Sequence, residues 1–509
     1  MLLAIDKSFS SLPVCALLMS LAPLAHAQLA EPAPATAAPP EQVTQPAAAT
    51  VVEGTAAATG ELRSDSPHSW FWRPPLTASV AEGDERWTLT LYGFVQGDFI
   101  VDTTRSYDDA IGPSLVARSD TYAGQTARSQ LSVRNSRLGL MFTAPSIAGI
   151  RSSAVVEADF FGSHPQAPGT VARSEQAFFD NPAFRLRHAY FQAQTEHVDV
   201  LVGHTYAVFG FQNYFSPCSI AYLGLPNQLF ARAAQLRAAR TFSLTPDIQL
   251  DAALAATRPG QRDSAVPDFQ AGVRLSYMPW KGISTPGNIG TVAQPLSVAL
   301  SGTVRQFKVN AFAPPPTQRS NSATGWGVSL DTLVPIIAAR DADDRGNRLT
   351  FTGSFVTGSG IADLITAGGG ASFPTLPNPA QMNPPPLYTQ NIDDGLVTFD
   401  TQGVAHTIDW WAMRFGIQYY IPPTGRLIVS ANYTQAHSGN MAQLFPKGGA
   451  EIELLARVAD RTHYADVNLM WDATPSIRVG LSGQYTHVVY LDKDAPNNLR
   501  VMAQGLYAF

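Results

Sequence analysis

The chain has 509 residues and a formal net charge of −6, and charged residues make up only 15% of it, against roughly 25% in a typical soluble domain. Such a composition does not favour an ordinary soluble domain, and we expect no nucleic-acid partner. After the first residues, no window of about 18 or more uninterrupted apolar residues predicts a membrane-spanning helix. If the chain is exported, it is either a secreted β protein or a membrane barrel, because only helices and closed barrels satisfy their backbone in lipid.

Residues 1–27 are predicted to form a secretory signal peptide. Lys7 gives a weakly basic start, Leu12–Leu24 forms a short apolar stretch, and Ala25-His26-Ala27 matches a small-x-small cleavage site. The apolar stretch is too short for a spanning helix. Removal of this segment would leave Cys218 as the single cysteine, so we expect no disulfide within the mature chain.

Residues 28–86 are predicted to be a disordered periplasmic linker, because they are rich in Ala, Pro and Thr and lack both strand and helix periodicity. Eight acids and three arginines give this segment a charge of −5, which leaves −1 for the remainder from Trp87. The aromatic patch Trp70-Phe71-Trp72 either touches the membrane interface or the barrel mouth, or forms a local cluster before the first strand.

From Trp87 onward, apolar and polar residues alternate with a period of two, as in strands with one apolar face. The alternation returns in segments of about ten residues, which is typical of a membrane barrel and is rarely so frequent in a soluble sandwich. We therefore predict an all-β fold for residues 87–509, a transmembrane antiparallel barrel of about 16 strands. The predicted strands lie near residues 87–103, 131–144, 150–161, 183–195, 197–206, 229–244, 247–258, 268–279, 295–309, 323–334, 348–357, 407–421, 425–436, 461–473, 475–490 and 498–509.

The predicted connections alternate in length. Those after even-numbered strands are mostly tight turns, with 280–294 and 335–347 as exceptions, and those after odd-numbered strands are mostly long. A barrel with periplasmic turns and extracellular loops has this alternation, and both termini then lie on the periplasmic side. The long connection 358–406, rich in Gly and Pro, is predicted to be a flexible extracellular loop. Asp341–Gly346 faintly resembles a calcium loop but lacks the ligand spacing, so a solvated turn is favoured.

The last segment predicts the strand that closes the barrel. One face is small or apolar and ends in two aromatic residues, whereas Arg500 and Gln504 point the other way. The residues of that face are Val501, Ala503, Gly505, Tyr507 and Phe509. A terminus of this kind resembles the signal that the barrel-assembly machinery recognises. An ordinary edge strand that happens to end in Phe is the alternative.

The connection 206–228 contains no charged residue and many aromatic ones, which is unusual for an exposed loop. We predict that it folds into the lumen as a constriction. The residues proposed to form the constriction are Tyr206, Phe209, Phe211, Tyr214 and Phe215. The alternative is a loop buried at a subunit interface.

Assigning each strand by its apolar face places more arginines than acids in the lumen, and almost no lysine. Arginine stays charged and offers a planar fork to carboxylates and phosphates, so rings of it favour anions. The predicted substrate-binding residues are Arg185, Arg187, Arg137, Arg237, Arg274, Arg305 and Arg414, with Arg185 and Arg187 favoured as the densest pair. The acids predicted to face the lumen are Asp98, Asp102, Glu157, Asp159, Asp199, Asp251, Asp331 and Asp466. These arginines either bind solutes or pair with the acids and stiffen the wall.

No catalytic motif stands out, and neither a metal site nor a cofactor is predicted. There is no Gly-x-Ser-x-Gly, His-Glu-x-x-His or phosphate-binding Gly-Lys-Ser/Thr pattern. A few membrane barrels hydrolyse lipids with Ser and His on the outer wall, but the histidines here are scattered without an evident Ser partner.

Several segments in order resemble the DcaP-like outer-membrane porin family. They are Leu91–Asp98 (LYGFVQGD), Arg134–Gly139 (RNSRLG), Glu157–Phe160 (EADF), Phe184–Tyr190 (FRLRHAY) and Val202–Phe209 (VGHTYAVF). The resemblance covers the first third of the barrel by motif and the remainder by pattern. It implies a trimeric porin of sixteen strands for small anions such as dicarboxylates and aromatic carboxylates. Members carry a helical N-terminal segment, whereas residues 28–86 show no heptads and many prolines.

Together, these patterns predict a porin in the outer membrane of a Gram-negative bacterium. It would contact outer-membrane lipid and form a water-filled diffusion channel for small anionic solutes. The alternatives are a structural or adhesive barrel with little conductance and a barrel-embedded lipid hydrolase.

Overall fold

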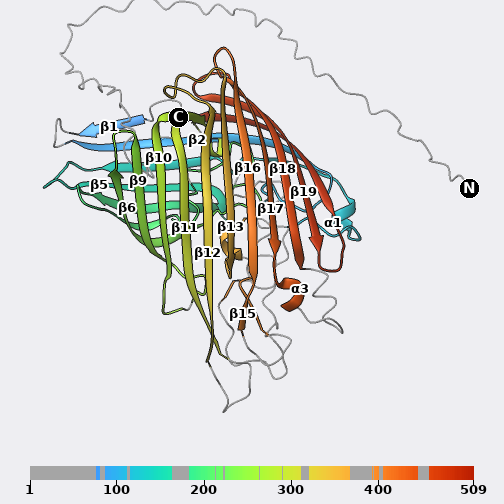
Figure 1. The fold of residues 1–509 in the computed structure, drawn as a ribbon. Coiled ribbons are helices and arrows are strands. Elements are labelled where there is room, and N and C mark those ends of the chain that lie inside the picture. The colour runs from blue at the N-terminus through green and yellow to red at the C-terminus, as the bar shows by residue number, and fades with distance from the viewer. Residues whose placement is uncertain are drawn as a thin grey trace, which may run out of the picture. The chain divides into compact units, whose positions relative to one another are not determined.

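The structure is a computed structural model that describes most of the chain after residue 75 (Figure 1). The described ranges are 76–80, 86–111, 115–162, 183–212, 214–221, 224–262, 264–288, 290–310, 320–366, 392–393, 395–399, 405–444 and 458–509. The predicted signal peptide, most of the predicted linker and the Trp70-Phe71-Trp72 patch lie outside these residues. No helix in the described ranges is long and apolar enough to cross a membrane, a finding that does not bear on β-barrels.

The core of the fold is a closed antiparallel barrel of 16 strands, as predicted. One wall position is shared by two short strands, β3 and β4, which both pair with β2. The strands are β2 (Trp87–Asp102), β3 (Arg128–Ser132), β4 (Arg137–Thr143), β5 (Arg151–Gly162), β6 (Ala183–Gln194), β7 (Asp199–Tyr206), β8 (Arg232–Ser243), β9 (Ile248–Thr257), β10 (Asp268–Ser284), β11 (Val292–Asn310), β12 (Ser320–Ile337), β13 (Arg348–Ser359), β16 (Asp409–Ile421), β17 (Leu427–Ser438), β18 (Ala459–Asp472), β19 (Ile477–Tyr490) and β20 (Asn497–Ala508).

The last strand closes the barrel against the first. β20 pairs with β2 from Phe94 opposite Ala508 to Asp102 opposite Arg500. The backbone N–H of Phe509 donates to the Gly93 carbonyl, and the Gly93 N–H donates to the Phe509 carbonyl, both at 3.1 Å. The closing strand predicted from the C-terminal pattern is therefore confirmed, and no free sheet edge is left between these two strands.

The two faces of the wall differ as a membrane barrel requires. On β18, Val467, Leu469 and Trp471 are 59%, 45% and 50% exposed, whereas Asp466 and Asn468 point inward and are buried. Apolar side chains are thus exposed and polar ones buried, the reverse of a soluble protein. This distribution suits a wall with lipid outside and a polar lumen inside. All eight acids predicted to face the lumen are buried, which confirms the parity assignment for them.

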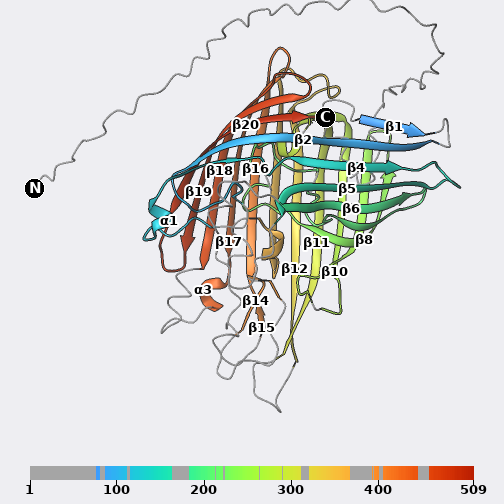
Figure 2. The same cartoon turned by 180° about the vertical axis from the view of Figure 1, so that it is seen from behind.

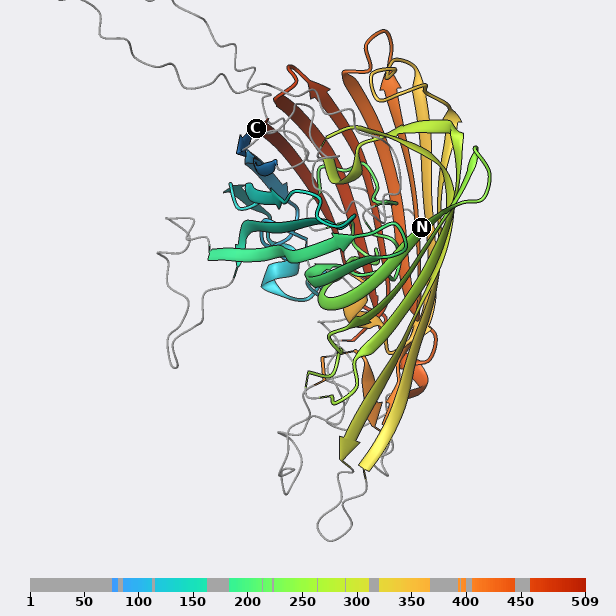
Figure 3. The same cartoon turned by 90° about the vertical axis from the view of Figure 1, so that its left-hand side faces the viewer.

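Short turns gather at one end of the barrel and long connections at the other. Figures 1 and 2 show the C-terminus and β1 at one end and α3 (Met441–Leu444), β14 (Val397–Phe399) and β15 (Ala405–Thr407) at the other. The predicted alternation of short and long connections is confirmed. Figures 1 and 3 also show that the strands of facing walls cross, as tilted strands in a closed barrel do. Short helical turns occur at α1 (Tyr122–Gln125), η3 (Pro286–Asn288) and η4 (Ala362–Leu364).

Several strand ends differ from the prediction, as in β10, which runs to Ser284 instead of residue 279, and two segments differ in kind. Leu76–Val80, assigned to the linker, forms strand β1 and pairs with Trp87–Leu91 of β2, beyond the reach of β20. The predicted strand 131–144 is interrupted between β3 and β4. Its break is held by Asn135 and Ser136, whose side chains hydrogen-bond the Gln96 side chain and backbone at 2.9 and 3.0 Å.

The Asp341–Gly346 segment is a turn at the short-turn end. Asp341 Oδ1 accepts from the backbone N–H groups of Asp343 and Asp344 at 3.0 Å. Arg348 and Arg340 contact Asp344 at 2.5 and 3.3 Å and lower the pKa of that carboxyl to about 2. The carboxylates of Asp341 and Asp344 therefore hold the turn together.

Candidate functional site: a loop across the lumen and an arginine-rich wall

The connection between β7 and β8 folds into the lumen, as predicted. All five aromatic residues predicted for the constriction are buried, with exposed fractions of 7% or less. They are Tyr206, Phe209, Phe211, Tyr214 and Phe215. We call the described parts of residues 207–231 the inner loop.

One side of the inner loop packs on β10 to β12. The backbone N–H of Phe209 donates to Gln270 Oε1 at 3.1 Å, and that of Gly210 donates to Ser301 Oγ at 2.8 Å. Gly272 on the wall leaves room for the Phe211 ring, because a Cβ added at this position would lie 2.6 Å from that ring. The Arg274 guanidinium lies 3.6 Å from the centre of the Tyr214 ring, which adds a cation–π contact.

The other side is held by β17 and β18. The Cys218 carbonyl accepts hydrogen bonds from Ser430 Oγ at 2.7 Å and Asn432 Nδ2 at 2.9 Å. Ser219 Oγ donates to Asp466 Oδ2 at 2.6 Å. Because β10 and β18 lie on different sides of the closed barrel, the inner loop forms a bar across the lumen.

Part of the long connection after β13 joins this bar. The Thr366 N–H donates to the Gln228 carbonyl at 2.8 Å, and the Phe230 N–H donates to the Leu364 carbonyl at 3.0 Å. A buried apolar cluster combines residues of the two segments and the wall: Phe209, Leu225, Leu229, Ile361, Leu364, Ile365, Leu396, Val397 and Trp410. The prediction of a flexible extracellular loop is therefore wrong for the described residues 361–366 and 396–397, because their apolar side chains are buried inside the barrel.

An arginine-rich patch lies on β4, β5, β6 and β8, and the buried Arg187 is at its centre. Arg187 Nε donates to Glu157 Oε1 at 2.7 Å, Nη1 to Asp159 Oδ2 at 2.9 Å and Nη2 to the Tyr206 hydroxyl at 3.3 Å. Arg185 also binds Asp159, at 3.0 Å through Nε and 2.5 Å through Nη2. The structure therefore brings together the two arginines favoured by the sequence and ties both to lumen acids.

Two further arginines leave this patch with more cations than acids. Arg137 lies 3.3 Å from Glu157 Oε1. The Arg232 guanidinium lies 5.7 Å from the ring centres of both Tyr206 and Phe230. We call these four arginines with Glu157 and Asp159 the arginine patch; it carries a formal charge of +2.

The other predicted substrate-binding arginines lie along the wall and are not gathered at one point. Arg274 pairs with Asp251 at 2.7 Å, and Arg305 pairs with Asp268 at 2.7 Å and with Asp363 at 2.5 Å. Arg237 and Arg414 are buried on β8 and β16. The pairs of Arg274 and Arg305 suit the stiffening role, and solute binding by these four residues stays a prediction.

A cavity of about 50 Å³ separates the arginine patch from the inner loop. Its lining includes Arg137 and Arg187 on the wall side and Ser216 and Gln228 on the loop side. This volume holds one or two water molecules. The charged wall thus faces the uncharged loop across a narrow polar gap.

Sequence reasoning missed two features of the patch. Arg232 was not among the predicted substrate-binding arginines, and the histidines, His188 among them, were regarded as scattered. The register of β5 and β6 shifts between Glu157 and Ala158, so that Arg187 and His188 are both buried. His188 Nδ1 lies 2.9 Å from Thr205 Oγ1. A strand bulge of this kind leaves no signal in an alternating sequence.

Cys218 offers a direct test of the inner loop. Its side chain is buried, and burial raises the pKa of its thiol to about 12, so the reactive thiolate is scarce. We expect a maleimide to label Cys218 only after the barrel is unfolded, as measured by mass shift. Ser119→Cys, in a polar segment of the long connection after β2, provides a labelling control. Fast labelling of Cys218 in the folded protein would contradict a packed inner loop.

Fold and site together define a porin-type transmembrane barrel, with a loop that narrows the lumen. No protein-family model and no curated protein sequence matches the chain. Among solved structures, it is similar to the outer-membrane channel DcaP of Acinetobacter baumannii. The TM-score is 0.56 at 18% sequence identity, over 83% of this chain and 97% of that one. The resemblance predicted from the sequence motifs is therefore confirmed at the level of the fold.

Two other solved structures are more distant. The anion-selective porin from Comamonas acidovorans has a TM-score of 0.44 at 11% identity, over 83% of this chain and all of that one. OmpF of Salmonella typhi, in complex with daunomycin, has a TM-score of 0.45 at 11% identity, over 85% of this chain and all of that one.

Proposed function

We propose that the protein is a passive diffusion channel of the Gram-negative outer membrane that favours small anionic solutes. The observation that carries the proposal is the +2 arginine patch facing the uncharged inner loop across a narrow gap. Fixed arginines raise the local anion concentration and repel cations in a constriction. Solutes with a carboxylate fit best, because guanidinium groups bind carboxylates through two parallel hydrogen bonds.

The remaining parts of the proposal concern how the protein reaches and sits in its membrane. The predicted signal peptide would export it, and the closing strand that ends in Phe509 would be recognised by the barrel-assembly machinery. The short-turn end would then face the periplasm. A trimer is the assembly that the family resemblance implies, and chemical crosslinking of the purified protein tests it.

Ion selectivity is expected to follow the charge of the arginine patch. Arg185→Gln removes one positive charge and should weaken anion preference, whereas Glu157→Gln removes one negative charge and should strengthen it. The reversal potential of purified protein in a planar bilayer under a salt gradient measures both shifts.

The control for this experiment is Arg461→Gln, which removes an arginine from the outward parity of β18. Its reversal potential should match that of the unmodified protein. A cation-selective wild-type channel, or two patch variants that shift in the same direction, would contradict the proposal.

A structural barrel with little conductance is the second candidate, and one observation favours it. The apolar cluster of the inner loop and residues 361–366 fills part of the lumen. A folded protein that passes no ions in the same bilayer experiment would support this candidate. Carboxylates competing with chloride for the current would support the first.

A further inference from the structure

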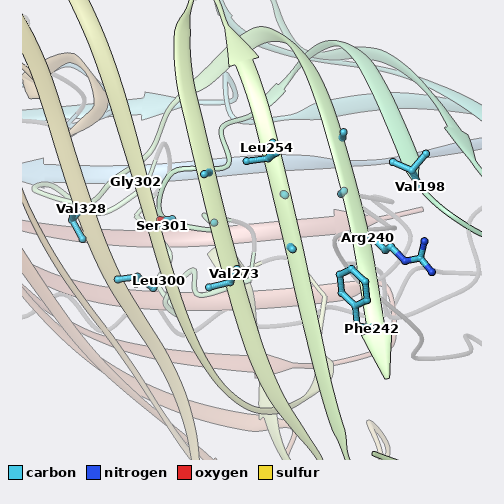
Figure 4. A pocket seen from close by; sticks show the side chains of 15 residues that line it. Val198, Arg240, Phe242, Leu254, Val273, Leu300, Ser301, Gly302 and Val328 are labelled. Carbon is cyan, nitrogen blue, oxygen red and sulfur yellow. The ribbon is translucent and has the colours of Figure 1, made fainter. Parts of the chain in front are cut away.

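The outer wall carries an apolar groove of about 610 Å³ over β8 to β12 (Figure 4). Its lining includes Leu254, Val273, Leu300 and Val328, each of which is 41% or more exposed. These side chains point away from the lumen, so the groove opens toward the membrane. Its site is therefore separate from the constriction.

The strand register explains why the wall is hollowed here. One outward row runs through Ala238, Leu254, Ala271, Gly302 and Val328 on five successive strands. The neighbouring row toward the long-connection end carries larger side chains, among them Leu236, Phe269, Val304 and Trp326. The alanine and glycine positions of the first row lie beside these larger side chains and leave the outer wall hollowed across the strands.

A single cation lies at the β8 end of this groove. Figure 4 shows Arg240 and Phe242 beside each other near the end of that strand, and the guanidinium lies 5.1 Å from the ring centre. Arg240 Nη1 donates to the His197 carbonyl at 2.6 Å, in the short turn between β6 and β7. The contacts of Arg240 within the described part of the chain are this carbonyl and the Phe242 ring, with no carboxylate among them, and its Nε has no hydrogen-bond partner.

The position of Arg240 matches the border between hydrocarbon and headgroups. It lies three residues before the end of β8, and the turn that follows joins β8 to β9. Arginine on the lipid-facing wall costs about 2–4 kcal/mol at the bilayer centre and about 0–1 near the interface. An arginine retained there without an acid is suited to a phosphate at headgroup depth.

We propose that this groove binds a glycerophospholipid, with its phosphate on Arg240 and one acyl chain over Ala238, Ala252 and Ala271. Charge complementarity selects this occupant, because an apolar surface of a second copy would leave the Arg240 guanidinium without a counter-charge. The proposal goes beyond solute passage. It depends only on the wall facing lipid, so it can fail while the channel function holds.

Binding can be measured on the delipidated, detergent-solubilised protein by native mass spectrometry with added dioleoylphosphatidylglycerol. Arg240→Gln should weaken binding about tenfold, because one charge-assisted hydrogen-bond site is lost. Ala271→Leu fills the groove floor and should weaken it at least as much. Ala465→Leu and Arg461→Gln, on the outward parity of β18, are matched controls that should retain binding. Ion conductance should be unchanged in all four variants.

Two further ligands separate the sources of affinity. Diolein lacks the phosphate, so it should bind the unmodified protein about as weakly as the phospholipid binds the Arg240→Gln variant. Glycerol phosphate lacks acyl chains, so it should not compete with the phospholipid for the groove. The proposal is overturned if Arg240→Gln and Ala271→Leu bind phosphatidylglycerol as the unmodified protein does. It is also overturned if Ala271→Leu leaves lipid binding intact but separates an oligomer into monomers, which would make this face an interface between copies.

Discussion

Replacing residues 209–229 by a short Gly-Ser linker is expected to raise the single-channel conductance severalfold. These residues cross the lumen from the β10–β12 wall to β17 and β18, so their removal widens the space inside the barrel. The excision leaves the barrel intact, because Tyr206 already pairs with Arg232 and the Ala207 N–H donates to the Ala231 carbonyl at 3.1 Å. The two ends of the loop are therefore neighbours, and a tight hairpin can join them.

A milder variant tests the same bar without shortening it. Ser430→Ala with Asn432→Ala removes both side-chain donors to the Cys218 carbonyl. The freed loop should fluctuate, and the single-channel current should become noisier at unchanged barrel stability in SDS gels. Thr352→Ala, a buried position on β13 outside the loop anchors, is the matched control. A shortened, correctly folded variant with wild-type conductance would show that ions pass elsewhere. A silent wild type and a conducting variant would identify the loop as a plug.

Much of the barrel was predictable because lipid imposes a strict period of two on every strand. The predicted strands 183–195 and 498–509 match β6 and β20 within one residue. The inner loop was also predictable, since a long connection without one charged residue has a buried environment as its simplest explanation. In both cases the signal lies in residues adjacent in the sequence.

The pairing inside the arginine patch was not predictable, because it depends on residues far apart in the sequence. Arg185 and Arg187 were correctly assigned to the lumen, but their partners depend on how β5 is aligned with β6. The register shift near Glu157 sets that alignment, and alternation alone does not specify where an extra residue is accommodated. The packing of residues 361–366 against the inner loop is likewise a contact between segments far apart in sequence, so composition alone favoured an exposed loop.

Arg187→Gln is expected to destabilise the folded barrel by about 3–5 kcal/mol, the range for breaking a buried ion pair. Arg187 is 2% exposed and holds Glu157, Asp159 and Tyr206 at once. Glutamine would leave the buried Glu157 carboxylate 3.3 Å from Arg137 Nε and 3.8 Å from His188 Nε2, without the arginine that lies nearest to it. Urea unfolding in lipid vesicles, followed by tryptophan fluorescence, measures the loss.

The control and the rescue variant decide whether the charge pair is responsible. Arg340→Gln breaks an ion pair whose arginine side chain is 86% exposed, and the cost should stay below about 1 kcal/mol. Adding Glu157→Gln to Arg187→Gln should restore part of the stability, because the stranded carboxylate is removed along with its partner. Equal losses in the single and double variants would mean that Arg187 supports the wall through packing. Partial rescue would mean that the acids of β5 hold Arg187 in place. Arg137 and Arg232 would then be the arginines that give the patch its net positive charge.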